Sequence, residues 1–263
     1  QASLMSSTWQ VLSSRLGDDA EGTGLFSKFS KFEAALSASV TSPESGTQLA
    51  ALLDSANAVV TELNSLSKLV SQQRSEADRE IADGVKVVNK ALKQIEELNG
   101  LLVGVDGSTS QAAALMDERQ RTLDTIAEYL PIEVVPREGG AIDIITVEGV
   151  YLVAGKAKQL DFSPANSFGA DMTLDNGALS GLTIDGQNLT PGASSYAAVS
   201  SGMFGALFTL RDTDLPAFGA QLDTIANDLV TRLSNDSIDP TKTPGDFGLF
   251  VDTGTPGDPG LAG

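Results

Sequence analysis

A repeating apolar pattern between Glu44 and Val105 constrains this 263-residue chain more than any other feature. Its first part places apolar residues at alternating spacings of three and four: Leu49, Leu52, Ala56, Val59, Leu63, Leu66 and Val70. That spacing is the a and d seam of a heptad, so it predicts a long helix that packs against other helices. The pattern breaks near residues 73–78 and resumes at Ile81, displaced by one residue and with Asn99 at one seam position.

The resumed half of this segment contains Gly84, which leaves two interpretations of its length open. A glycine inside a helix costs roughly 1 kcal/mol relative to alanine, so a kink or a break between two helices is one of them. A continuous helix is the other, and at about 1.5 Å per residue it would be on the order of 90 Å long. The continuous helix predicts a rod-like architecture, and the broken one predicts an ordinary antiparallel bundle with a bend.

The seam requires partner helices, and other segments of the chain carry suitable patterns. Those with helical spacing are Ser3–Leu16, Leu25–Ser39, Ala112–Leu130 and Leu215–Leu233. The third follows capping candidates at Ser108–Ser110. For the fourth, Asp214 is the expected N-cap and Pro216 lies in the first turn. The chain therefore contains enough helix to build an elongated antiparallel bundle.

Residues 131–201 change to a period of two, which is typical of strands. Short strands are expected at Ile132–Val134, Ile142–Ile144 and Tyr151–Val153. Hairpin-turn signals separate the strand candidates at Gly139-Gly140, Asn176-Gly177 and Asp185-Gly186. We therefore predict an α+β fold, in which a small antiparallel β subdomain is inserted between the helices of a rod-like, coiled-coil-like bundle.

These patterns predict four parts along the chain. A helical rod domain covers residues 1–130, the β subdomain covers 131–201, helices of 202–235 return to the bundle, and 236–263 form a Pro- and Gly-rich extended tail. No apolar run approaches the roughly 18 residues that span a bilayer, so the sequence predicts no membrane span.

Composition excludes several classes of function. The chain has no Cys and no His, so zinc fingers, thiol nucleophiles, haem-binding histidines and Ser-His-Asp triads are ruled out within it. Its formal charge of −18 repels phosphate backbones and anionic lipid, which makes nucleic acid and bare membrane poor partners. Phosphate-cradle motifs are absent as well.

Two kinds of acidic cluster are candidates for catalysis or metal binding. Adjacent carboxylates occur at Asp18-Asp19, Glu96-Glu97 and Asp117-Glu118, but neighbours on a helix point in different directions, so a solvated face is expected. A second cluster could supply oxygen ligands to calcium: Asp171, Asp175, Asn176 and Asp185. Its spacing lacks the EF-hand order, and turn chemistry explains these residues better. We therefore expect no catalytic, cofactor-binding or metal-binding residue, and no cofactor.

Three stretches carry a joint similarity to a known family. The first is GLFSKFSKFEAAL at 24–36, followed by Ser42-Pro43 and a long helix that ends in QIEELN at 94–99. The second is DERQRTLDTIA at 117–127, leading through IEVV at 132–135 to LVAG at 152–155. The third is SGMFGALFTLRD at 201–212, followed by Leu215-Pro216 and QLDTIA at 221–226. In this order and spacing the stretches resemble the flagellar hook-associated protein 1 family (FlgK), the hook-filament junction proteins.

The resemblance implies a structural role and no enzymatic activity. The resemblance implies that this chain is a core fragment of the family's helical-rod domain and lacks both terminal polymerisation segments. It also implies that this fragment is a monomer in solution. The implied location is extracellular, at the hook-filament junction of the bacterial flagellum, after export through the flagellar type III channel. The implied partners are the flagellar hook protein, the second hook-filament junction protein, other copies of the full-length protein and an export chaperone.

Three alternatives differ from the junction role. Another axial flagellar protein, either hook-associated or flagellin-like, would share the helical rod. A secreted adhesin would bind its ligand on residues 131–201. A carboxylate-dependent hydrolase would need two carboxylates roughly 5 to 9.5 Å apart in a cleft.

Overall fold

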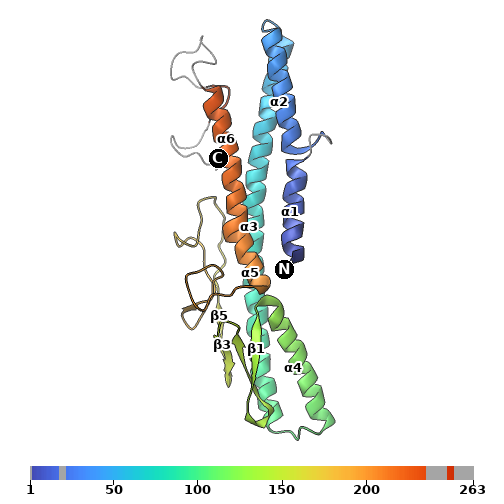
Figure 1. Ribbon diagram of the computed structural model, residues 1–263, viewed down its shortest axis with the longest axis vertical. Helices are drawn as coiled ribbons and strands as arrows, with labels where there is room; N and C mark the ends of the chain where they lie inside the picture. The colour runs from blue at the N-terminus through green and yellow to red at the C-terminus, as the bar shows by residue number, and fades with distance from the viewer. Residues whose placement is uncertain (1, 18–21, 235–247, 252–263) are drawn as a thin grey trace. The chain divides into compact units, whose positions relative to one another are not determined.

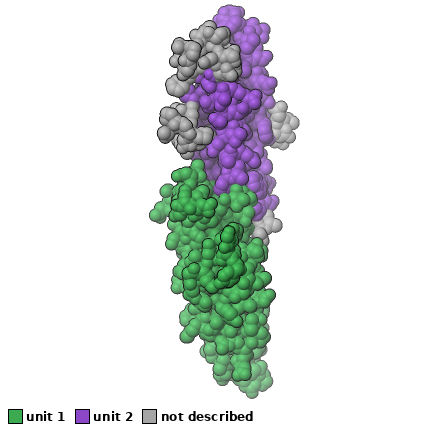
Figure 2. Space-filling view, turned by 60° about the vertical axis from the view of Figure 1, so that its left-hand side comes forward, with its two compact units in different colours: residues 1, 74–214 green, residues 2–73, 215–263 purple. Residues whose placement is uncertain are grey.

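The computed structural model describes residues 2–17, 22–234 and 248–251, which form two compact units (Figures 1 and 2). The mixed unit comprises residues 74–214, and the helical unit comprises the described residues of 2–73 and 215–251. Helix α3 (Gly46–Val103) contributes residues to both units. It runs for 58 residues and passes through Gly84 without a break, which settles the two interpretations of the heptad segment.

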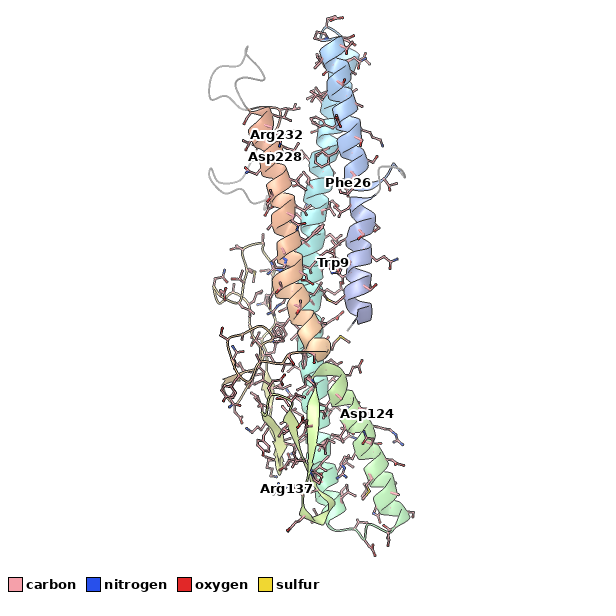
Figure 3. All side chains as sticks on the ribbon, in the orientation of Figure 1. Trp9, Phe26, Asp124, Arg137, Asp228 and Arg232 are labelled. Atoms are coloured by element: carbon pink, nitrogen blue, oxygen red, sulfur yellow. The ribbon has the colours of Figure 1, made fainter. Side chains whose placement is uncertain are left out.

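The helical unit combines the first part of α3 with α1 (Ala2–Leu16), α2 (Gly24–Thr41) and α6 (Leu215–Leu233) (Figure 1). Trp9 of α1, labelled in Figure 3, packs edge-on against Phe218 of α6 with ring centroids 6.2 Å apart. Phe32 of α2 makes a similar contact with the buried Phe250, at 5.6 Å. The four helices thus share an aromatic and aliphatic core, and residues 248–251 lie against it.

Burial along α3 confirms the predicted seam. The seam residues from Ala56 to Val70 are buried, and so are those from Ile81 to Leu102. The first two seam residues are the exceptions, because Leu49 has 44% of its surface exposed and Leu52 is half-buried. An apolar stripe of this width is stable only when other helices cover it, which explains why the predicted partner segments are helical.

The mixed unit places the second part of α3 beside α4 (Ser110–Tyr129). Thr109 caps α4, since its side-chain oxygen accepts a hydrogen bond from the N–H of Ala112 at 3.2 Å. This confirms that the cap lies within Ser108–Ser110, and it satisfies one N–H that the first turn would otherwise leave unpaired.

Two small antiparallel sheets complete the mixed unit. The four-stranded sheet has the order β1-β2-β3-β4, from Ile132–Pro136, Ile142–Thr146, Tyr151–Ala154 and Lys156–Ala157. The three-stranded sheet has the order β5-β6-β7, from Leu160–Asp161, Thr183–Ile184 and Gln187–Asn188. Strand β2 alternates buried and half-buried residues, as a strand with one covered face does. The predicted α+β class with a small antiparallel β part is confirmed.

Several local predictions differ from the structure. Asp185-Gly186 does connect a pair of strands, β6 and β7, and Asp185 has a positive φ of 49°. Asn176-Gly177 forms a turn with no strand on either side, so that hairpin prediction is wrong. Its side-chain amide instead stabilises the turn, accepting hydrogen bonds from the N–H groups of Thr173 and Ala178.

The chain after residue 201 also differs. Helix α5 (Gly202–Thr209) and a π-helical turn (Leu210–Asp214) lead into α6 with no intervening loop. Asp214 is therefore part of continuing helical structure, and its predicted role as an N-cap is wrong. Helix α5 lies within the predicted helical stretch 202–235, although it is apolar on all sides and buried from Phe204 to Phe208, so no amphipathic period marks its bounds.

The predicted tail 236–263 lies outside the described residues except for 248–251, and the four-part division of the chain stays a prediction. None of the described helices combines the length and apolar character needed to cross a membrane.

Gly84 has a packing role within α3. A Cβ atom at this position would lie 2.6 Å from Cε1 of Tyr129 on α4 and 2.8 Å from Cε1 of Phe204 on α5. The two rings are in contact with each other, with centroids 5.3 Å apart. The missing side chain therefore lets an aromatic pair from two elements lie directly on the backbone of the long helix.

Candidate functional site

Polar side chains on one side of α3 hold the backbone of the β part, and we call Asn89, Glu96 and Asn99 the docking row. Asn99 donates from Nδ2 to the carbonyl of Ile142 at 2.8 Å, and its Oδ1 accepts from the N–H of the same residue at 3.1 Å. Asn89 repeats the arrangement with Leu160, at 2.9 and 2.8 Å. Each amide thus pairs with a main-chain unit as a neighbouring strand would.

Glu96 is the charged member of the docking row. Its Oε2 accepts from the N–H of Ala157 at 2.9 Å, while Lys93 and Lys156 each lie 3.0 Å from Oε1. The backbone hydrogen bond and the two ammonium groups lower the pKa of Glu96 to about 2. The carboxylate is therefore ionised at neutral pH and fixes the short strand β4 to α3.

A second polar group, the buried ion cluster, consists of Arg74, Asp78, Arg211 and Asp212. Nη1 of Arg211 lies 2.5 Å from Oδ1 of Asp78, and both side chains are closed to solvent. Asp212 accepts from Nε and Nη2 of Arg211 at 2.8 Å each. Two cations and two carboxylates balance in charge, which is the condition under which buried ions are tolerated.

Arg74 connects this cluster to a segment that has no regular secondary structure. Its guanidinium donates to the carbonyls of Met172 at 2.6 Å, Arg211 at 2.9 Å and Gly169 at 3.3 Å. It also lies over the ring of Phe168, 5.4 Å from the centroid. Burial lowers the pKa of Arg74 from its ordinary value, with Arg211 adding to that effect and Asp212 opposing it.

The cluster holds a segment that has little regular structure of its own. Asp78 accepts from the N–H of Ala165 at 2.8 Å, and Arg211 donates to the carbonyl of Ser180 at 3.1 Å. Residues 163–181 contain no helix or strand, so their backbone groups need side-chain partners. The ion cluster supplies those partners, and it begins at the residue where the mixed unit begins on α3.

Two sequence signals pointed to these groups without revealing them. The seam break at 73–78 falls where Arg74 and Asp78 replace apolar residues, and Asn99 stands at a seam position. A polar residue on an apolar seam indicates a buried partner, but not that the partner is the main chain of a distant segment. Asn89, Glu96 and Arg211 carried no such signal.

The structure shows where the adjacent carboxylates considered as catalytic candidates lie. Glu118 accepts from Gln94 at 2.9 Å and pairs with Arg121, while its neighbour Asp117 is exposed. Asp18 and Asp19 lie outside the described residues. Within the described ranges, no group of three or more acidic side chains is arranged to hold a metal.

The calcium candidates take part in turns and ion pairs. Asp185 pairs with Lys158 at 2.8 Å, and the carbonyl of Asp171 accepts from the amide of Asn176 at 2.7 Å. The side chain of Asp171 interacts electrostatically with Arg74, raising the pKa of that guanidinium against the effect of burial. These interactions belong to turns and to the surroundings of the ion cluster.

The helical unit contains a groove of about 640 Å³ between α1 and α3. It is lined by Val11, Ser14 and Arg15 of α1 and by Thr61, Asn64, Ser65, Lys68, Leu69 and Gln72 of α3. Arg15 donates to Ser65 at 2.6 Å and lies 3.7 Å from Glu62, which also pairs with Lys28. The lining residues include two cations and no carboxylate.

Comparison with known proteins agrees with this fold. The chain is 23% identical over 198 residues to flagellar hook-associated protein 1 of Escherichia coli (strain K12), covering 73% of this chain and 34% of the relative. Its structure resembles that of the flagellar hook junction protein FlgK from Burkholderia pseudomallei, with a TM-score of 0.68 and 18% identity. That match covers 89% of this chain and 40% of the solved one.

The chain therefore spans well under half the length of both relatives. The model of the FlgK helical domain matches residues 11–237, which include the docking row, the buried ion cluster and the groove. The resemblance predicted from the three sequence stretches is confirmed. This chain belongs to the family of the flagellar hook-associated protein FlgK helical domain.

Proposed function

We propose that this chain is the helical-domain part of a structural subunit that joins the hook to the filament of a bacterial flagellum. The observation that carries the proposal is the match of residues 11–237 to the FlgK helical domain. Both relatives are named for the flagellar hook or its junction. A passive connecting role also agrees with a fold in which the docking row and the buried ion cluster fasten one segment to another.

The proposal assigns no catalysis to the chain. The charged groups of the buried ion cluster are paired with each other or with the main chain, and Arg211 and Asp78 are closed to solvent. A carboxylate that acts on a substrate must reach it, so this cluster is suited to stability and unsuited to acid-base chemistry. The docking row is engaged in the same way.

The partners proposed are the hook protein, the second junction protein, further copies of the same subunit and an export chaperone. The proposed location is outside the cell, at the hook-filament junction, after passage through the flagellar type III channel. Support for these finer statements comes from the family alone, and each can be tested separately from the fold.

Deletion of the encoding gene tests the junction role. We expect cells with hooks but without filaments by electron microscopy, and flagellin released into the medium. Complementation with the wild-type gene should restore filaments. Normal filaments and normal swimming in the deletion strain would contradict the proposal and would direct attention to residues 131–201 as an adhesive surface.

A further inference from the structure

The groove between α1 and α3 differs in charge from the rest of the chain. Among 35 acidic and 17 basic residues overall, its lining has Arg15 and Lys68 and no acidic side chain. Arg15 is partly neutralised by Glu62, whereas Lys68 is exposed and has no ion-pair partner among the described residues. A cationic groove on an acidic protein attracts an acidic surface.

A matching surface occurs on α4 of the mixed unit. Asp117, Asp124 and Glu128 are exposed, and their spacings of seven and four residues place them on one stripe of the helix. None of the three has a cationic partner among the described residues. Figure 3 labels Asp124 on α4. Exposed Met116, with 40% of its surface accessible, adds an apolar contact beside this acidic stripe.

The groove and the stripe agree in length. The groove is lined along α3 from Thr61 to Gln72, and the stripe runs from Asp117 to Glu128. Each interval covers eleven residue steps, or about 16 Å at about 1.5 Å per residue. The acidic stripe of α4 therefore matches the groove in length.

The positions of the charges select one orientation. If the two helices run parallel, Lys68 stands level with Asp124, while Thr61 and Gln72 stand level with the two outer carboxylates. If they run antiparallel, Lys68 stands level with Arg121, and like charges repel. The parallel arrangement pairs a cation and two hydrogen-bond donors with three carboxylates.

We infer that the groove binds the acidic stripe of α4 from a second copy of this chain. The contact joins two different surfaces, so it is head-to-tail, and repetition closes a ring when the rotation between copies allows it. The inference rests on the proposed function, because a junction built from many copies of one subunit needs a contact between neighbouring copies. A single groove holds one helix, so one contact is weak, and closure of the ring strengthens it.

Carbodiimide coupling tests the contact directly. The reagent condenses an amine with a carboxylate in contact with it, so that Lys68 and Asp124 form an amide while the carbodiimide takes up the water as a urea. An equal mixture of ¹⁴N- and ¹⁵N-labelled chain is coupled, digested and analysed by mass spectrometry. We expect Lys68–Asp124 peptides, with about half of them of mixed isotope, as random pairing between copies requires.

Matched variants establish the site. Lys68→Gln should remove these peptides, whereas Lys31→Gln, at an exposed lysine of α2 outside the groove, should leave their yield unchanged. Lys68→Asp and Asp124→Lys should each lower intermolecular coupling at least five-fold, and together restore at least half of it. Absence of Lys68 from mixed-isotope peptides, or its coupling within single copies only, would overturn the inference.

Complementation of the deletion strain separates this inference from the proposed function. If the deletion removes filaments and Lys68→Asp restores them as well as wild type, the groove contact is wrong and the junction role stands. If the deletion leaves filaments normal, the junction role is wrong whatever the coupling shows.

Discussion

Arg211 and Asp78 form an ion pair with 0% and 1% of their side chains exposed, at a distance of 2.5 Å between Nη1 and Oδ1. The first residue comes from the π-helical turn and the second from α3, 133 positions earlier in the chain. The pair joins three segments, since the other carboxylate oxygen of Asp78 binds the N–H of Ala165.

Removing one partner of this pair should be strongly destabilising. Asp78→Ala leaves the guanidinium of Arg211 with Asp212 and the carbonyl of Ser180 and strands the N–H of Ala165, and loss of one member of a buried pair costs about 3 to 5 kcal/mol. Urea unfolding followed by circular dichroism measures the change. In the double variant Asp78→Leu with Arg211→Met, the loss of unfolding free energy should be smaller than the sum of the losses in the two single variants Asp78→Leu and Arg211→Met. Additive losses would show that the two side chains act independently.

Asn99 should be irreplaceable by an apolar residue, although it stands on an apolar seam. Asn99→Leu leaves both main-chain groups of the buried Ile142 without partners, at a cost of about 1 to 3 kcal/mol for each unsatisfied group. Asn227→Leu, on an exposed position of α6, should stay within about 0.5 kcal/mol of wild type. Equal effects of the two substitutions in urea unfolding would argue against a docking role for Asn99.

Two glycines of α3 should respond in opposite directions to alanine. Gly84→Ala places a methyl group against the rings of Tyr129 and Phe204, and overpacking of this kind costs about 1 to 3 kcal/mol, more than the roughly 1 kcal/mol gained in helix propensity. Gly100→Ala meets no atom within 4 Å, so it should stabilise the chain by up to about 1 kcal/mol. Thermal unfolding of both variants provides the comparison, and a gain in stability at Gly84 would contradict the close packing.

The stabilising effect of Glu96 should depend on pH. Its folded pKa, about 2, lies below the ordinary value, so its contribution is complete above about pH 5 and is lost as the pH falls towards 2. Glu96→Gln should therefore be less stable than wild type at pH 6, and the difference should shrink as the pH falls. A constant difference in urea midpoint from pH 6 to pH 3 would show that charge is not the cause.

Periodicity predicted the long elements well because the energetics behind it are local in sequence. The seam from Ala56 to Leu102 follows from helix geometry, and so does the placement of α6 at Leu215–Leu233. The three-stranded sheet was not predicted, since strands of two residues such as β5 and β6 show no alternation. Its strand β5 bonds to Asn89 of α3 and pairs with β6, which lies much later in the chain.

At the docking row, α3 and the β part differ in how many amino-acid substitutions they tolerate. Asn89, Glu96 and Asn99 contact N–H and C=O groups, which nearly every amino acid supplies, at Ile142, Ala157 and Leu160. Apart from Lys156, which pairs with Glu96, exposed positions of the β part can therefore diverge without loosening these hydrogen bonds, provided that proline avoids the donor positions. The hydrogen bonds of the docking row are encoded in three side chains of α3, so a β segment that presents its main chain at the same three points would keep them.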